Sequence, residues 1–244
     1  MSDLPLSAER VAWRRPDRRV AIITGAGSGA GAAIARAFAA DGVRVLVSDV
    51  DYMLAGDVAA DIRDHGGTAL AHRCDVTSDE QVSGLFERAQ REFGNVDYVV
   101  NNAGPRQAGD PLAQAVRIID ANLLGTVRVT ARAIDAMRLR GGAVVNVAAA
   151  EGLGFGASAH PAFAAAKAGV LRFTTALETL ATGRGVRVYC VAPDRIDSPE
   201  AFGEFVVSLS GHVDCAGRVV LYRAGGESLI IAAEDAGYGK VEAF

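Results

Sequence analysis

Short β-branched runs alternate along the chain with longer, alanine-rich segments whose apolar residues recur every three or four positions. The segments AAIARAFAAD (32–41) and SDEQVSGLFERAQREF (78–93) show the second pattern, which is typical of amphipathic helices. Strands that alternate this regularly with helices predict βαβ units and a buried parallel sheet. The predicted strands are VAIIT (20–24), RVLVS (44–48), TALAHR (68–73), VDYVVN (96–101), AVVNVA (143–148), VRVYCVA (186–192) and RVVLY (218–222).

This pattern predicts one α/β domain with a Rossmann-like, doubly wound architecture. It would contain a seven-stranded parallel sheet with helices on both faces. The sequence shows no internal repeat, low-complexity tract or linker, and half of its 244 residues are apolar, which suits a single large core. We therefore expect an N-terminal extension at 1–17, the domain at 18–232 and a C-terminal tail at 233–244.

Composition and charge narrow the classes of function. The net charge of −4 comes from interspersed signs, so we expect no nucleic-acid partner. The three cysteines (Cys74, Cys190 and Cys215) lack metal-ligand spacing and indicate a reduced chain without a metal site. The Arg-rich N-terminus lacks the apolar core of a signal peptide, and no apolar run approaches a membrane span. We expect a cytoplasmic protein that does not associate with membranes.

The turn TGAGSGAG (24–31) after the first predicted strand carries the clearest chemistry. Its glycines let the backbone approach a pyrophosphate, and the following helix N-terminus offers unpaired N–H groups and a partial positive charge. The same glycines also suit a tight connection that binds nothing. Asp49, which closes the second strand, can bond both hydroxyls of an adenine ribose and would repel a 2′-phosphate. The pattern therefore favours NAD over NADP, although Asp49 can instead cap the helix that follows.

Further motifs appear in order and give the chain a resemblance to the short-chain dehydrogenase/reductase family. They are CDVT (74–77), NNAG (101–104), Asn122 in DANLLG, VVNV (144–147) and Lys167, and the resemblance runs from about residue 18 to about 225. It implies hydride transfer between a nicotinamide and a carbinol or carbonyl carbon. The positions that it implies for cofactor binding are Thr24, Gly25, Gly29, Gly31, Asp49, Asp75, Val76, Asn102, Ala103, Gly104, Lys167 and Pro193.

Two residues of the family's catalytic set are replaced. The family moves the hydroxyl proton with a tyrosine, which the lysine four residues on holds as tyrosinate, and bonds the substrate oxygen with a serine after the fifth strand. This chain keeps Asn122 and Lys167 but has Phe163 at the tyrosine position and Ala149 at the serine position. Loss of a general acid/base costs about 10²- to 10⁴-fold in rate, and a lost oxygen donor a comparable factor. The resemblance therefore implies a catalytically degenerate member.

Other residues near these positions leave an alternative open. Ser158, His160 and Glu151 are candidate substitutes for proton transfer, although polar residues at helix starts often serve only as caps. Asp194 replaces the glycine that follows the family's proline after the sixth strand. The residues from Asp194 to Gly217 also leave too little chain for both a helix at 200–209 and a lid over the substrate.

The helices expected at about 111–139 and 161–183 form subunit interfaces in the family. Here the first is apolar on more than one face and the second is rich in small residues, which favours a protein partner. Both could instead pack only on the parent sheet.

The pattern of losses resembles that of inactive partner subunits known in the family, such as the one in the hydroxyacyl-CoA dehydrogenase of benzylsuccinate breakdown. The leading hypothesis is a structural subunit that pairs with an active short-chain dehydrogenase paralogue in an NAD-dependent hetero-oligomer, expected to be a tetramer. One alternative is an NAD-binding sensor. Another is an active oxidoreductase in which Lys167 or His160 carries the proton.

Overall fold

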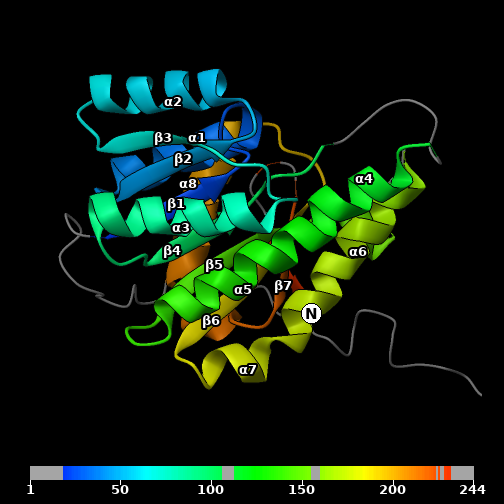
Figure 1. The fold of residues 1–244 in the computed structure, drawn as a ribbon. Helices are drawn as coiled ribbons and strands as arrows, with labels where there is room; N and C mark the ends of the chain where they lie inside the picture. Colours follow the sequence, from blue (N-terminus) through cyan, green and yellow to red (C-terminus); the bar gives the residue numbers. More distant parts are fainter. Residues whose placement is uncertain (1–18, 106–112, 155–159, 224, 226–227, 232–244) are drawn as a thin grey trace, which may run out of the picture.

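A computed structural model describes residues 19–105, 113–154, 160–223, 225 and 228–231. Its single sheet has the order β3-β2-β1-β4-β5-β6-β7-β8, and the chain crosses from one half of the sheet to the other between β3 and β4 (Figure 1). The first seven strands are parallel, which confirms the doubly wound architecture. They are β1 (Val20–Thr24), β2 (Arg44–Asp49), β3 (Ala69–Arg73), β4 (Tyr98–Asn101), β5 (Gly142–Val147), β6 (Val186–Pro193) and β7 (Val219–Tyr222).

The predicted count of seven strands was too low by one. An eighth strand, β8 (Ser228–Ile231), pairs antiparallel with β7 at the edge of the sheet. Its sequence SLII is only four residues long, so periodicity alone did not separate it from the C-terminal segment. The predicted extension at 1–17 and tail at 233–244 lie outside the described residues.

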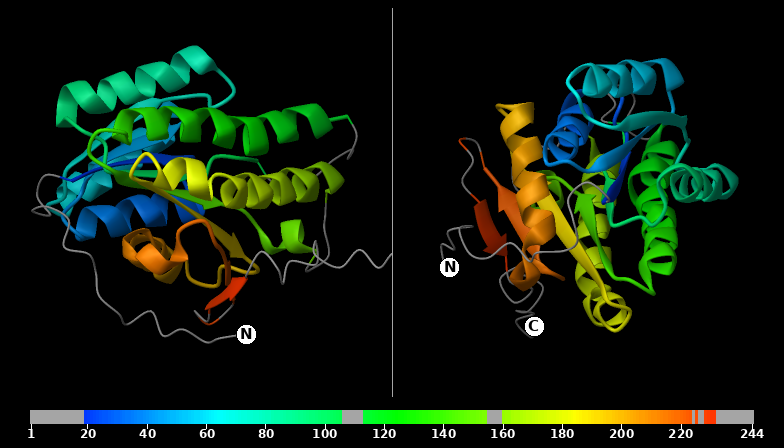
Figure 2. Two further views of the ribbon diagram at one scale, coloured as in Figure 1. Left: turned by 90° about the horizontal axis from the view of Figure 1, so that it is seen from below. Right: turned by 90° about the vertical axis from the view of Figure 1, so that its left-hand side faces the viewer.

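Helices cover both faces of the sheet (Figure 2). One face carries α1 (Gly29–Ala40), α2 (Tyr52–Asp64) and α8 (Pro199–Gly211), whose buried residues pack in one cluster with β1 and β6. The other face carries α3 (Asp79–Phe93), α5 (Gly125–Met137) and α6 (Pro161–Ala176). The shorter helical elements are α4 (Ala115–Ile119), the π-helical turn η2 (Asp120–Leu124), the 3₁₀ turns η3 (Ala150–Leu153) and η4 (Val213–Cys215), and α7 (Glu178–Thr182).

The two long helices expected near the subunit interfaces are each divided. Within the described residues the first begins at Ala115 and runs as α4, η2 and α5, so a π turn interrupts it. The second is α6 followed by α7, with Leu177 between them. Apolar periodicity averages over such a turn, so the sequence showed one helix in each case.

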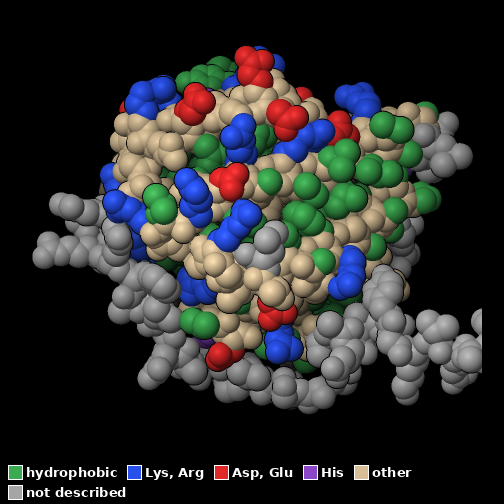
Figure 3. Space-filling view, turned by 60° about the horizontal axis from the view of Figure 1, so that its bottom comes forward, with side chains coloured by type: hydrophobic (Ala, Val, Ile, Leu, Met, Phe, Trp, Pro, Cys, Tyr) green, Lys and Arg blue, Asp and Glu red, His purple; other side chains and the backbone are tan. Residues whose placement is uncertain are grey.

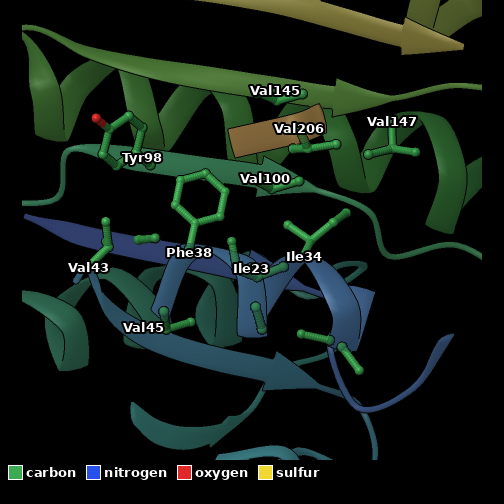
Figure 4. Close-up of a cluster of buried hydrophobic side chains, with 14 of the residues drawn as sticks. Ile23, Ile34, Phe38, Val43, Val45, Tyr98, Val100, Val145, Val147 and Val206 are labelled. Atoms are coloured by element: carbon green, nitrogen blue, oxygen red, sulfur yellow. The ribbon is translucent and has the colours of Figure 1, made fainter. Parts of the chain in front are cut away.

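The core explains why the strands read as continuous apolar runs. All five residues of β1 are buried, because Ala21 and Ile23 face α1 while Ile22 faces α3. On the α1 side, the rings of Phe38 and Tyr98 lie 5.3 Å apart between centroids (Figure 4). This contact holds the carboxyl-terminal turn of α1 against the start of β4, the strand that pairs with β1.

The connection from β6 to α8 is short. The strand ends at Pro193 and the helix begins at Pro199, and Ser198 caps that helix by accepting the N–H of Ala201. α8 then packs tightly on α1, where a Cβ at Gly203 would come 2.7 Å from the Ala33 carbonyl oxygen. The residues between β6 and α8 therefore hold no separate lid.

Burial predicts weak thiol reactivity. It raises the pKa of Cys74 to about 11 and that of Cys190 to about 12, so both thiols stay protonated near neutral pH. We expect the native protein to react with a disulfide reagent near pH 8 at least about 100-fold more slowly than the urea-unfolded chain. Absorbance of the released thiolate measures the rate. Rapid modification of any one thiol in the native state would contradict this expectation.

Candidate functional site

The turn after β1 is tied to the segment after β4. The buried Thr24 side chain accepts the backbone N–H groups of Asn102 and Ala103 at Oγ1, each at 3.2 Å. The Asn102 amide Nδ2 donates to the Gly25 carbonyl at 2.9 Å. The TGAGSGAG and NNAG motifs, 77 residues apart, are therefore held together at the carboxyl edge of the sheet.

The glycines of the turn meet different surroundings. Gly25 has φ +60°, and a Cβ there would lie 2.7 Å from Ala103 Cα. A Cβ at Gly31 would lie 2.0 Å from the Gly25 carbonyl oxygen. Gly29 also has a positive φ, +53°, but a Cβ there would meet no atom within 4 Å. Gly25 and Gly31 are thus needed for packing, whereas Gly29 borders open space.

That open space lies at the amino end of α1. The N-cap residue Ser28 makes no side-chain capping bond, and the first turn contains no acidic residue. The first N–H groups of an α-helix have no partner within the helix, and the helix dipole is positive there. The position therefore suits an anionic group such as a pyrophosphate.

Asp49, at the end of β2, faces the same turn. Its Oδ2 accepts the Gly27 N–H at 2.9 Å and its Oδ1 accepts the Asp51 N–H at 3.0 Å. Each carboxylate oxygen has a second acceptor position, so both can also accept a ribose hydroxyl. The role of helix cap belongs to Asp51, which accepts the N–H groups of Met53 and Leu54, and not to Asp49 as the sequence had suggested.

The Asp75–Val76 pair follows β3 and lies beside this site. Cys74 donates its N–H to the Asp49 carbonyl at 2.9 Å, which places the CDVT motif next to the end of β2. Asp75 Oδ1 accepts both the N–H and the hydroxyl of Thr77, at 2.9 and 2.7 Å. The positions predicted for the adenosine and pyrophosphate portions of a dinucleotide thus come together.

Gly104 and Asn122 are also in contact. Asn122 lies in the π turn η2, is fully buried, and donates from Nδ2 to the carbonyls of Ile118 and Pro105 at 3.0 and 3.2 Å. A Cβ at Gly104 would come 2.1 Å from Asn122 Oδ1. Any side chain at Gly104 would therefore displace the amide.

Lys167 is buried within the fold. Its Nζ donates to the Val147 carbonyl at 2.9 Å and lies 5.4 Å from the centre of the Phe163 ring. The whole residue is only 5% exposed. The ammonium group is held by the end of β5 and by an aromatic face, an arrangement that stabilises a buried cation.

Phe163 and Ala149 lie in one small apolar cluster. They are 6% and 5% exposed, and they pack with Ile118 and Ala162. The two positions at which the family carries hydroxyl groups are therefore brought together, but by hydrocarbon contact. Neither side chain can donate or accept a proton.

The candidate substitutes differ in position. His160 is the buried N-cap residue of α6, and its side chain makes no capping bond. Glu151 lies half-buried in η3, and Ser158 falls outside the described residues. Asp194 is exposed beyond Pro193, and its N–H donates to the Tyr222 carbonyl at 2.9 Å.

Sequence reasoning missed a buried polar network at the ends of β4 and β5. Asn101 Nδ2 donates to Thr130 Oγ1 at 2.9 Å and to Asn146 Oδ1 at 2.8 Å, and Asn146 Nδ2 donates to Thr174 Oγ1 at 2.9 Å. It joins both strands to α5 and α6. Its only signal in the sequence is an asparagine near the end of each of two β-branched runs.

Neither a metal site nor a membrane span is found in the part of the chain that the structure describes. No three His, Cys, Asp or Glu side chains there are grouped so that they could hold a metal ion. The helices of the same part are too short or too polar to cross a membrane.

Comparison with known proteins supports the resemblance. The short chain dehydrogenase family model matches residues 19–203. Cis-4-hydroxycyclohexanecarboxylate dehydrogenase of Sinomonas cyclohexanicum is 40% identical over 191 residues, which cover 76% of each chain. L-fucose dehydrogenase of Bos taurus is 37% identical over 186 residues, which cover 74% of this chain and 67% of the relative.

Solved structures agree in fold. A short chain dehydrogenase from Mycobacterium avium superposes with a TM-score of 0.81 at 29% identity, over 88% of this chain and 86% of that chain. A 7α-hydroxysteroid dehydrogenase complexed with NADH and 7-oxo glycochenodeoxycholic acid gives a TM-score of 0.78 at 26% identity, over 89% of this chain and 97% of that chain.

Proposed function

Because the chain belongs to the short-chain dehydrogenase family, a family of oxidoreductases, we propose that it is the non-catalytic subunit of an NAD-dependent dehydrogenase complex. The observation that carries this proposal is the apolar cluster in which Phe163 and Ala149 are buried. In an active relative these positions would hold the proton-transferring tyrosine and the oxygen-binding serine.

The chemistry of the reaction supports the proposal. A bound nicotinamide supplies the hydride acceptor, but an alcohol must also lose its hydroxyl proton to a group within hydrogen-bond reach. Phe163 cannot take that proton, and the ammonium group of Lys167 is bonded to the Val147 carbonyl. The expected loss for the missing acid/base alone is about 10²- to 10⁴-fold. The second loss, at Ala149, need not multiply with it.

A partner is suggested by the outer face of α4, η2, α5 and α6. Figure 3 shows hydrophobic side chains gathered over it in the right half of the view. Val116 and Leu124 are 80% and 43% exposed, and Ala131 and Ala165 are also exposed. A contiguous apolar surface of this kind marks protein interaction sites. We call this surface the α5–α6 face and propose that an active short-chain dehydrogenase paralogue covers it in a hetero-tetramer.

The decisive experiment is co-expression with a paralogue that carries the complete Ser, Tyr and Lys set, followed by size exclusion and NADH absorbance assays. We expect a mixed oligomer that turns over, while this chain alone does not. Phe163→Ala in this chain should leave the mixed oligomer's rate unchanged, whereas Tyr→Phe at the paralogue's catalytic position should abolish it. Turnover by this chain alone, or failure of the two chains to associate, would contradict the proposal.

Two other functions are each favoured by one specific observation. An NAD-binding sensor is favoured by the Asp49 carboxylate and the open space at Gly29, and it requires dinucleotide affinity together with a partner that responds to it. An active enzyme with another proton carrier is favoured by the buried His160 at the start of α6. In that case His160→Ala would abolish turnover by the isolated chain. The finer proposal of a hydroxyacyl-CoA substrate, as in benzylsuccinate breakdown, rests on the pattern of losses alone.

A further inference from the structure

We infer that this chain binds adenosine diphosphate groups through half of the ancestral cofactor cleft and leaves the nicotinamide half of a dinucleotide in solution. This inference rests on the proposed function, in which Phe163 and Ala149 take no part in catalysis. It assigns the cleft a ligand class that includes ADP-ribose and ADP as well as NAD⁺ and NADH.

The adenosine half of the cleft keeps the groups that such a ligand needs. The Asp49 carboxylate is oriented by two backbone N–H groups, those of Gly27 and Asp51, and both of its oxygens can still accept a ribose hydroxyl. Gly29 borders open space where a pyrophosphate would meet the amino end of α1. A Cβ at Gly27 would lie 3.0 Å from the Asp49 carboxylate, so the close approach of turn and carboxylate also depends on a glycine.

The half of the cleft that would hold the nicotinamide lacks a comparable set of groups for its ligand. The family's lysine binds the nicotinamide ribose, but here the Lys167 ammonium donates to the Val147 carbonyl and lies over the Phe163 ring. The whole of Lys167 is only 5% exposed, so little of it is open to a ribose hydroxyl.

The residues after β6 also fail to build the nicotinamide half. Asp194 places an exposed carboxylate directly after Pro193, and the chain then enters α8 at Pro199. Arg195 pairs with Asp197, so its guanidinium group is directed to its own loop. The described connection thus offers no segment that could fold over the ring.

Binding through the adenosine diphosphate half alone has a consequence for ligand selectivity. Because oxidised and reduced dinucleotides differ only in the nicotinamide ring, a site that contacts only the adenosine diphosphate half cannot distinguish them. The chain would respond to the total concentration of adenosine diphosphate ligands and not to the redox ratio. Asp49 would still repel a 2′-phosphate and exclude NADP.

The test compares ligands on the full-length chain by isothermal titration calorimetry. We expect NAD⁺, NADH and ADP-ribose to bind with Kd values that agree within about threefold, and NADP to bind at least about tenfold more weakly. Bound NADH should keep the fluorescence intensity and emission maximum of free NADH, because its ring stays in water. Binding of NAD⁺ at least about tenfold tighter than ADP-ribose, or no binding of ADP-ribose, would overturn the inference.

A pair of carboxylate variants locates the site. Asp49→Ala should weaken ADP-ribose at least about tenfold, as expected for loss of a charged partner to two hydroxyls. Asp57→Ala, which removes an exposed carboxylate from α2, should bind ADP-ribose like the natural chain. Equal effects of both variants would overturn the assignment to Asp49. Turnover by the isolated chain would instead overturn the non-catalytic role, whatever the ratio of affinities, so the two failures are distinguishable.

Discussion

Gly31→Ala is expected to lower the free energy of unfolding by about 3 kcal/mol, the upper range for overpacking a dense interior. The added Cβ would lie 2.0 Å from the Gly25 carbonyl oxygen and 2.5 Å from Asn102 Nδ2. These two atoms are hydrogen-bonded to each other, so neither can move without breaking the bond that joins the turns after β1 and β4. Urea unfolding followed by circular dichroism measures the change.

Gly29→Ala is the matched control in the same turn. Its backbone is also left-handed, at φ +53°, which costs an alanine about 1–2 kcal/mol, but its Cβ would meet no atom within 4 Å. We therefore expect a clearly smaller loss than for Gly31→Ala. Equal losses would mean that backbone strain and not the contact with Gly25 determines the effect.

The difference between these glycines explains how a cofactor fingerprint can outlast catalysis. Gly31 lets α1 pack against β1 whether or not a nucleotide is bound, so folding alone is enough to require it. Gly29 has open space in place of such a neighbour. Its left-handed backbone, at φ +53°, already favours glycine, and the open space beside it is where a ligand could lie.

Most of the fold follows from the strand pattern because parallel strands buried on both faces read as continuous apolar runs. VAIIT became β1 without any shift, and the helix predicted at 200–209 lies inside α8. The extra strand β8 was missed because its four residues show too little alternation to predict a strand, and its pairing with β7 is a tertiary contact.

The site was predictable as far as it depends on residue order at the carboxyl ends of strands. Thr24, Asp49 and Asn102 close β1 and β2 or follow β4, so the sheet topology brings them together. Contacts that depend on how the helices pack could not be predicted from the sequence. Which aspartate caps α2, and whether Lys167 Nζ reaches the Val147 carbonyl, are decided by the packing of α2 and α6.

Leu124→Asp is expected to dissociate the proposed mixed oligomer. Leu124 ends the π turn between α4 and α5 and is 43% exposed on the α5–α6 face. Covering this face would bury a carboxylate without a partner, at a cost of roughly 3 kcal/mol or more, which corresponds to at least about a 100-fold weaker association. Sedimentation velocity of the co-purified chains over a dilution series measures the change.

Val213→Asp tests whether any exposed apolar residue would give the same result. Val213 is 50% exposed, but it lies in η4, which follows α8 and packs through Cys215 in the cluster on the other face of the sheet. The Val213 variant should therefore assemble like the natural chain, because its carboxylate would stay in water. If both variants dissociate the complex, the partner does not select the α5–α6 face. If the Leu124→Asp variant assembles normally, the apolar side chains of the α5–α6 face do not contact the partner, which must then bind elsewhere.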